Sequence, residues 1–178
     1  MIVSTAPSRV SLFGGGTDLP DFADKYGGRV LSMAVNLKHV CTVISKDGNT
    51  VIEAMGESRE IQNTVPARHL DKKFDLMYEV MRSYVDIPPV LVDDVYEGIQ
   101  SSGHGSSASA AVSLIGALDK LKHVKRTRLE KEKKAWQSEI NLGWVSGKQD
   151  QYAAALGGMN LIEFENGDVW VDEIPKPL

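Results

Sequence analysis

The segment from residue 103 to residue 107 constrains this chain most, because two glycines and two serines lead directly into an apolar pattern at helical spacing. The pattern continues through Ala108, Ala111, Val112, Ile115 and Leu118. A helix that begins in this segment presents unpaired backbone N–H groups and the positive end of its dipole. An anion can approach glycine closely, because glycine has no Cβ.

Two interpretations of this segment stay open from its residues alone. It is a phosphate cradle, in which a serine hydroxyl also reaches a magnesium ion, or a flexible turn with a serine cap that binds nothing. The P-loop pattern is excluded, because no lysine follows Gly105.

A second glycine cluster lies near the N-terminus. A strand pattern that contains Arg9 runs into residues 14–16, which are all glycine, and Thr17 and Asp18 follow. The neighbouring hydroxyl and carboxylate could hydrogen-bond the hydroxyls of a sugar, or Asp18 could simply cap a following helix. Arg9 is either a functional cation or an edge residue that faces water.

A third segment places Lys148 and Asp150 at the start of a predicted helix. A lysine beside a carboxylate is a plausible pair for activating a hydroxyl. A carboxylate in a first helical turn is also favoured by the helix dipole without any catalytic role.

The pattern of elements predicts one α+β domain with a mostly antiparallel sheet and helices on one face. Strands are expected at residues 2–7, 9–13, 29–35, 39–46, 50–54, 90–95, 159–165 and 168–173. Residues 46–49 are expected to form a hairpin turn between two of these strands, and residues 56–68 a loop or weak strand. Helices are expected at residues 74–85, 108–118, 127–142 and 146–156.

Composition excludes several classes of protein. Cys41 is the single cysteine and the four histidines are scattered, so neither a disulfide framework nor a Cys/His metal cluster is expected. The N-terminus lacks the basic head of a signal peptide, and no apolar run reaches membrane-spanning length, so we expect a cytoplasmic protein without a membrane partner. The net charge is −4, and the basic run between residues 120 and 134 is interrupted by Glu130 and Glu132. A solvated helix face is favoured there over a nucleic-acid site.

The order and separation of the three segments resemble the kinases of the galactokinase, homoserine kinase, mevalonate kinase and phosphomevalonate kinase (GHMP) superfamily. Its first motif reads P-x-R/K-V-x-L-x-G and matches residues 7–14, and its second reads G-x-G-S-S-A and matches residues 103–108. Asp150 matches the catalytic aspartate that follows. Residues 14–18 and 147–160 are most similar to the heptose 7-phosphate kinases, and the resemblance spans residues 5–164.

The resemblance implies the N-terminal GHMP domain, with a ribosomal protein S5 domain 2-like fold, over residues 1–178. It implies transfer of phosphate from ATP, with Mg²⁺, to the C1 hydroxyl of a heptose 7-phosphate. Phosphate contacts are expected from Gly103, Gly105, Ser106 and Ser107. Magnesium contacts are expected from Ser107 and Glu139. Asp150 is expected to accept the hydroxyl proton, Arg9 and Lys148 to stabilise charge, and Gly16, Thr17 and Asp18 to hold the sugar.

The chain departs from the family in several ways. Residues 99–102 lack the proline that the family usually has before the second motif. His104 occupies an apolar position of the second motif, and Ser138 competes with Glu139 for the magnesium position. Family members are about twice as long and have a C-terminal domain that this chain lacks. We therefore expect poor activity from the chain alone, and as partner a C-terminal half or a second copy. The alternatives are a galactokinase- or fucokinase-like enzyme and a non-catalytic S5-like binding domain.

Overall fold

The computed structural model describes residues 1–61, 72–99 and 103–175. Its strands are β1 (Ile2–Phe13), β2 (Gly28–Ser45), β3 (Thr50–Ala54), β4 (Glu57–Ile61), β5 (Val90–Tyr96), β6 (Met159–Glu165) and β7 (Asp168–Ile174). They form one sheet in the order β4-β3-β5-β2-β6-β7, with β1 paired to β2. The pair β3–β5 is parallel and the other five pairs are antiparallel, which confirms the mostly antiparallel sheet.

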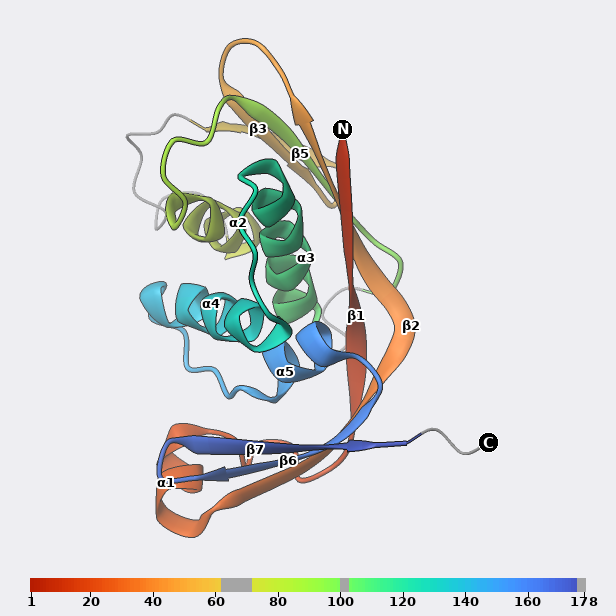
Figure 1. Ribbon diagram of the computed structural model, residues 1–178, viewed down its shortest axis with the longest axis vertical. Coiled ribbons are helices and arrows are strands. Elements are labelled where there is room, and N and C mark those ends of the chain that lie inside the picture. The colour runs from red at the N-terminus through yellow and green to blue at the C-terminus, as the bar shows by residue number, and fades with distance from the viewer. Residues whose placement is uncertain (62–71, 100–102, 176–178) are drawn as a thin grey trace.

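The long strand β2 organises the whole sheet. The sequence predicts two strands here, but the structure joins them into one strand of 18 residues. The first part of β2 pairs with β6 and the last part pairs with β5. Because β1 runs along the other edge of both parts, β2 connects the two halves of the sheet (Figure 1).

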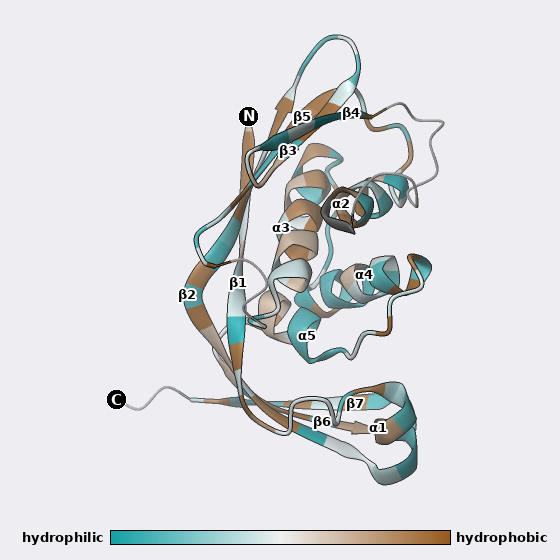
Figure 2. Cartoon of the chain, turned by 180° about the vertical axis from the view of Figure 1, so that it is seen from behind, coloured by the Kyte–Doolittle hydropathy of each residue, from teal (hydrophilic) through white to brown (hydrophobic). Residues whose placement is uncertain are grey.

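Most helices of the described residues gather on one face of the upper half of the sheet (Figure 1). The helices are α1 (Pro20–Tyr26), α2 (Lys72–Arg82), α3 (Ser106–Leu121), α4 (Arg128–Asn141) and α5 (Gln149–Leu156). Helix α3 is apolar on most sides and is buried between the sheet and the other helices, whereas α4 carries many hydrophilic residues (Figure 2). Among the helices in the described ranges, none is both long and apolar enough to span a bilayer.

Local sequence signals explain where the helices begin. Thr127 accepts a hydrogen bond from the backbone N–H of Glu130, whose side chain accepts from the backbone of Thr127 in return. This capping box satisfies backbone donors at the start of α4. Pro20 starts α1, a short helix that packs on β6. The sequence offered a helix here only as one that Asp18 could cap, but the N-cap is Leu19 and no side chain caps it.

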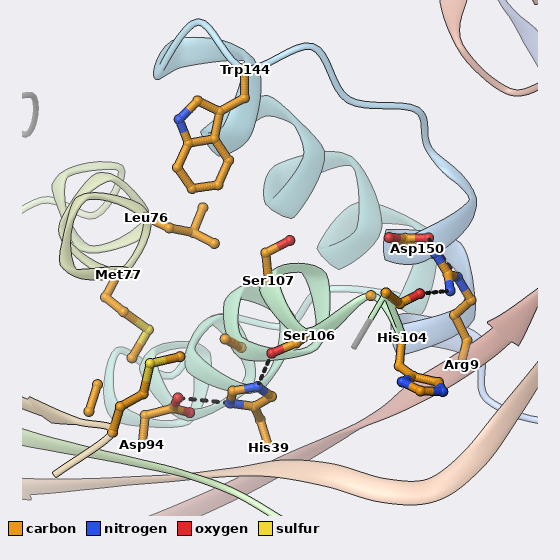
Figure 3. Close-up of a pocket in the computed structure, with 15 residues that line it drawn as sticks. Arg9, His39, Leu76, Met77, Asp94, His104, Ser106, Ser107, Trp144 and Asp150 are labelled. Atoms are coloured by element: carbon orange, nitrogen blue, oxygen red, sulfur yellow. Dashed lines mark hydrogen bonds and ion pairs between the residues drawn. The ribbon is translucent and has the colours of Figure 1, made fainter. Parts of the chain in front are cut away.

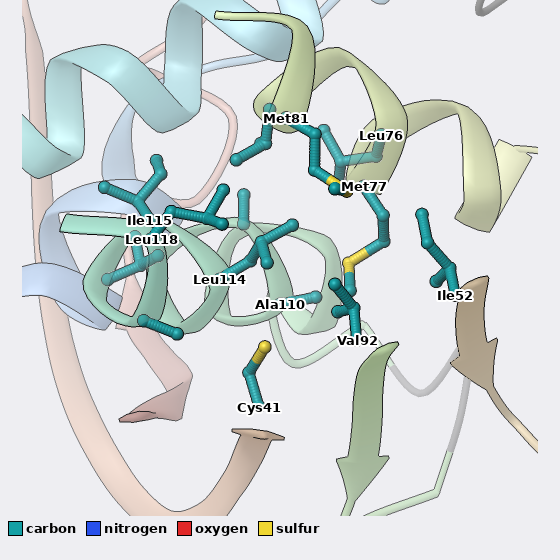
Figure 4. Packing of buried hydrophobic residues seen from close by; sticks show 14 of the residues in the cluster. Cys41, Ile52, Leu76, Met77, Met81, Val92, Ala110, Leu114, Ile115 and Leu118 are labelled. Atoms are coloured by element: carbon teal, nitrogen blue, oxygen red, sulfur yellow. The ribbon is translucent and has the colours of Figure 1, made fainter. Parts of the chain in front are cut away.

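The main core lies between the sheet and helices α2 and α3. Figure 4 shows residues of both helices meeting Cys41, Ile52 and Val92 of the sheet, and all three are fully buried. A smaller cluster of Ala23, Val30, Ile162 and Phe164 fixes α1 on the lower half of the sheet.

The predicted hairpin at residues 46–49 is wrong. The turn forms, but β3 does not pair with β2, because β5 inserts between them. Neighbours in sequence are the default neighbours in a sheet, but here α2 crosses back over the sheet and delivers β5 parallel to β3. Part of the segment predicted as a loop or weak strand forms β4, and its residues 62–68 lie outside the described residues.

Candidate active site

A pocket of about 430 Å³ opens at the N-terminus of α3 (Figure 3). Its polar lining comes from Arg9, His39, Asp94, Gly103, His104, Gly105, Ser106, Ser107 and Asp150. Its apolar lining comes from Ala54, Met55, Leu76, Met77, Ala110 and Trp144. The fold thus brings the glycine–serine segment, the predicted catalytic aspartate and the predicted arginine into one cavity.

An ion pair between β1 and α5 forms one wall of this pocket. Both Nε and Nη2 of Arg9 contact Oδ1 of Asp150, at 2.7 and 2.6 Å. Burial raises the pKa of the Asp150 carboxyl, the Arg9 cation opposes this rise, and the charge of Asp18 adds to it. The Asp150 carboxylate is therefore held through its Oδ1 by Arg9 and is largely shielded from water.

The same arginine holds the glycine–serine segment against the sheet. Nη1 of Arg9 donates to the carbonyl of Gly103 at 2.7 Å, and its backbone N–H donates to the carbonyl of His104 at 3.0 Å. Gly105, the N-cap of α3, has a φ of 68°, in the left-handed region that favours glycine. A Cβ at Gly105 would lie 3.1 Å from Cγ of Asp150, so the glycine lets the segment and the carboxylate approach each other.

The first turn of α3 suits an anion. No side chain caps the helix at Gly105, and no acidic residue occupies the first turn. Ser106 and Ser107 begin the helix at the edge of the pocket, so their N–H groups and the positive helix end are available to a phosphate.

The two predicted magnesium ligands come together although they lie on different helices. The Ser107 hydroxyl lies close enough to the carboxyl of Glu139 to lower its pKa, and Oε2 of Glu139 accepts from Gln151 at 2.8 Å and from Ser146. Oε1 of Glu139 is buried and finds no hydrogen-bond partner in the part of the chain that the structure describes. Burial raises the pKa of Glu139, the hydrogen bonds lower it, and the nearby Asp150 raises it.

This donor set fits a magnesium ion that is also bound by phosphates. Magnesium in such sites takes one or two protein oxygens and completes its shell with water and phosphate oxygens. An unpartnered carboxylate oxygen beside a serine hydroxyl supplies that kind of ligand. Ser138, the competing candidate, instead donates to the carbonyl of Lys134 in its own helix. Within the described residues, no group of three or more His, Cys, Asp or Glu side chains is placed to hold a metal by itself.

None of the predicted sugar-binding residues lines this pocket, and of the three only Asp18 contacts α5. The Thr17 hydroxyl donates to the carbonyl of Gly14 at 2.8 Å and accepts from the backbone N–H of Arg29 at 3.0 Å. Gly16, with a φ of 89°, has open space where a Cβ would be. Thr17 therefore stabilises the glycine turn, and its role toward a sugar stays a prediction.

Asp18 holds the first turn of α5. It is only 4% exposed, and its two oxygens accept from the backbone N–H and the side-chain amide of Gln149, at 3.0 and 2.8 Å. Any Cβ at Gly147 would overlap the Asp18 carboxyl, so close packing also needs this glycine. Because Asp150 follows Gln149, Asp18 positions the backbone that carries the predicted catalytic carboxylate.

Lys148 does not line the pocket. Its Nζ lies 4.6 Å from the centre of the Trp136 ring, in a cation–π contact, and its charge acts on Glu132. Its expected role in charge stabilisation stays a prediction, and it requires Nζ to leave Trp136.

The structure adds a pair of residues that the sequence did not reveal. His39 on β2 is 1% exposed and connects Asp94 on β5 to Ser106 on α3 (Figure 3). A signal was present in the sequence, because His39 occupies a buried position in the alternation that continues with Cys41 and Val43. A polar residue at such a position needs a partner, which the sequence did not identify.

A family model and a curated relative both match this chain. The family model for the GHMP kinases N terminal domain matches residues 63–158. A curated relative, the D-glycero-alpha-D-manno-heptose 7-phosphate kinase of Campylobacter jejuni subsp. jejuni serotype O:2, is 31% identical over 173 residues, which cover 93% of this chain and 51% of the relative. This chain therefore spans about half the length of that relative.

Solved structures of two kinases have a similar fold. A D-glycero-D-manno-heptose 1-phosphate kinase from Bacteriodes thetaiotaomicron superposes with a TM-score of 0.88 at 27% identity, covering 99% of this chain and 61% of that chain. The Methanococcus jannaschii mevalonate kinase shares the fold, with a TM-score of 0.80 at 20% identity, over 98% of this chain and 56% of its own. The chain belongs to the GHMP kinase family, whose N-terminal domain its sequence matches.

Proposed function

We propose that this chain is the N-terminal domain of an ATP-dependent sugar kinase, which phosphorylates the C1 hydroxyl of a heptose 7-phosphate. The observation that carries the proposal is the contact between Gly105 and Asp150, which places a carboxylate against the start of α3. A helix start of this kind binds phosphate, and a carboxylate beside it can act on an incoming hydroxyl. The heptose kinases among the relatives support the choice of substrate.

The pocket accommodates the two parts of a nucleotide at its two ends. Leu76, Met77 and Trp144 line an apolar end that suits a base, and the start of α3 suits the phosphates. Gly103, Gly105, Ser106 and Ser107 are assigned to the phosphates, and Ser107 and Glu139 to the magnesium ion. The bound ion neutralises charge on the phosphate oxygens.

The residues of the chain act mainly by positioning. Phosphoryl transfer needs aligned reactants and stabilised charge more than covalent participation of the protein. Asp150 orients the acceptor hydroxyl and takes its proton, and Arg9 keeps the carboxylate in place while it holds the glycine–serine segment. Gly16, Thr17 and Asp18 are assigned to the sugar side of the site, and Lys148 to charge stabilisation.

We further propose that residues 1–178 need a second domain to complete the site. The relatives extend well beyond the matched half, and an open pocket leaves bound phosphates in water, where charge contacts are weaker. That second domain is supplied by a C-terminal half or by a second copy of the chain, in the cytoplasm.

The test is ATP turnover by the full-length protein on a panel of sugars and sugar phosphates. We expect heptose 7-phosphate to be the best substrate, whereas a preference for galactose or fucose would support the alternative sugar kinases. Asp150→Asn should lower kcat by about two orders of magnitude, the scale of general-base loss. Asp47→Asn makes the same change in an exposed turn and should leave turnover unaffected. Near-normal turnover by Asp150→Asn would exclude the assigned role.

A further inference from the structure

A chain of hydrogen bonds runs from the sheet to the start of α3. Nδ1 of His39 lies 2.8 Å from Oδ2 of Asp94, and Nε2 of the same ring lies 3.0 Å from Oγ of Ser106 (Figure 3). The ring also stacks on Tyr96, which is its cross-strand partner, with centroids 4.5 Å apart and planes 12° apart. Three contacts on different sides therefore fix the position and the orientation of the imidazole.

The chemistry of the partners decides which way the bonds run. An ionised carboxylate only accepts, so Asp94 takes a hydrogen bond from Nδ1–H of His39. In a neutral ring, Nε2 is then an acceptor, and it receives the O–H of Ser106. With the ring neutral, the hydroxyl proton of Ser106 is directed into the protein, and the side chain is held in one position at the first residue of α3.

Structural stability alone is a poor explanation for this arrangement. Asp94 is 6% exposed, and its second oxygen, Oδ1, is buried without a hydrogen-bond partner among the described residues. A buried carboxylate with unmet hydrogen-bonding capacity costs free energy, and a well-packed apolar pair would often be at least as stable. The pair lies at the wall of the nucleotide pocket, and the residue that it holds is in the phosphate segment.

We propose that Asp94 and His39 are positioning residues for the nucleotide phosphates and act through Ser106. They anchor the first residue of α3 to β2 and β5, so that the N–H groups of the first turn are in place before a phosphate arrives. Preorganisation of this kind raises affinity, because less freedom is lost on binding. The inference rests on the proposed function for its ligand, but the bond directions are independent of that function.

The first experiment measures the dissociation constants of magnesium AMPPNP and of inorganic tripolyphosphate for the full-length protein. His39→Asn keeps a polar group near the Nδ1 position and leaves Ser106 without its partner, whereas His39→Gln can reach the Nε2 position. We expect Kd to rise about tenfold in His39→Asn, the size of one lost hydrogen bond, and clearly less in His39→Gln. KM for ATP should follow Kd, with kcat nearly unchanged. His123→Asn, at an exposed position just after the C-cap of α3, is the matched control and should bind normally.

A double-mutant cycle tests whether the pair acts through Ser106. Ser106→Ala should weaken tripolyphosphate binding as much as His39→Asn does, and the double variant should bind no more weakly than Ser106→Ala alone. Additive losses would overturn the inference. So would equal Kd values for His39→Asn, His39→Gln and the unaltered protein. Ser106→Ala leaves His39 and Asp94 in place, so this single variant, compared with His39→Gln, still tests the connection if His39→Asn folds poorly.

Nitrogen NMR of His39, without nucleotide, tests the bond directions directly. We expect a proton on Nδ1 and none on Nε2, and Asp94→Asn should reverse this tautomer because its amide can donate to Nδ1. A proton on Nε2 in the unaltered protein would overturn the stated geometry. If the unaltered protein binds neither AMPPNP nor tripolyphosphate, the proposed function fails together with this inference. If it binds both and the variants match it, only this inference fails.

Discussion

Arg9 and Asp150 are 141 positions apart in the sequence, yet two guanidinium nitrogens of Arg9 meet a single oxygen of Asp150. The other oxygen, Oδ2, would lie 3.2 Å from a Cβ at Gly105, so it faces the glycine–serine segment. The ion pair therefore anchors one side of the carboxylate and directs the other side toward the proposed phosphate site.

Removing the Arg9 cation should change the pH dependence of turnover. Burial raises the pKa of Asp150 and Arg9 lowers it, so Arg9→Met should raise this pKa further. A general base must be deprotonated, and the acid limb of the kcat/KM profile should therefore move to higher pH. Arg29→Met, which breaks an exposed ion pair with Glu163, should leave the profile in place. If the acid limb of the kcat/KM profile is at the same pH in Arg9→Met, the assignment of Asp150 as the base is contradicted.

The two glycines of the phosphate segment should differ in their tolerance of alanine. Gly103 and Gly105 both have a positive φ, so alanine strains the backbone at either position. Only at Gly105 does the new Cβ press on Asp150, at 3.1–3.3 Å, whereas at Gly103 the space is open. We expect Gly105→Ala to reduce kcat much more than Gly103→Ala, with similar losses of thermal stability. Matching kcat values would show that the contact with Asp150 is unimportant.

Asp18→Ala should destabilise the start of α5. It removes the acceptors for two hydrogen bonds from Gln149 and leaves a buried backbone N–H without its partner, a loss of about 2–3 kcal/mol in the free energy of unfolding. Urea unfolding measures this loss, and kcat should fall as well because Asp150 is displaced.

Gln149→Ala is the matched control, because it removes one of these bonds and leaves the Asp18 carboxylate in place. If Asp18 also binds the sugar, the sugar KM should rise more in Asp18→Ala than in Gln149→Ala. Equal KM values for the two variants would restrict Asp18 to its structural role.

Glu132 should make stability depend on pH. Burial raises its pKa to about 7, although Lys148 and Lys133 lower it, and within the described ranges its Oε1 has no hydrogen-bond partner. The folded protein therefore holds a proton on Glu132 that the unfolded chain releases near the ordinary glutamate pKa of 4.5. The stabilisation is complete below that value and is lost as pH rises through about 7.

The size of this effect follows from the shift in pKa, and amounts to about 3 kcal/mol at most. Glu132→Gln cannot ionise, so its stability relative to the unaltered protein should increase across this pH range. Chemical unfolding at several pH values measures the difference, with Glu165→Gln on the exposed hairpin as control. A difference that stays constant with pH would show that Glu132 does not titrate as described.

The sequence by itself determined much of the secondary structure and most of the residues that belong to the candidate site. Apolar residues at helical spacing identified the helices that became α2 and α3, and the glycine–serine segment identified the start of α3. The segment that became α4 was predicted as a charged helix, and glycines marked both ends of the segment that became α5. These features follow from local rules, because helix caps, turns and side-chain alternation depend on residues a few positions apart. The resemblance to a known family added the connection between Arg9, the glycine–serine segment and Asp150.

Only the tertiary structure decided which partner each polar group takes. It inserted β5 between β2 and β3, joined His39 to Asp94 and Ser106, directed Lys148 onto Trp136, and placed Asp18 on Gln149. A hydroxyl, carboxylate or ammonium group carries no local preference among distant partners. Its partner is chosen when packing of the apolar faces brings the strands and helices together, because a polar group buried in that process must then find a hydrogen bond nearby.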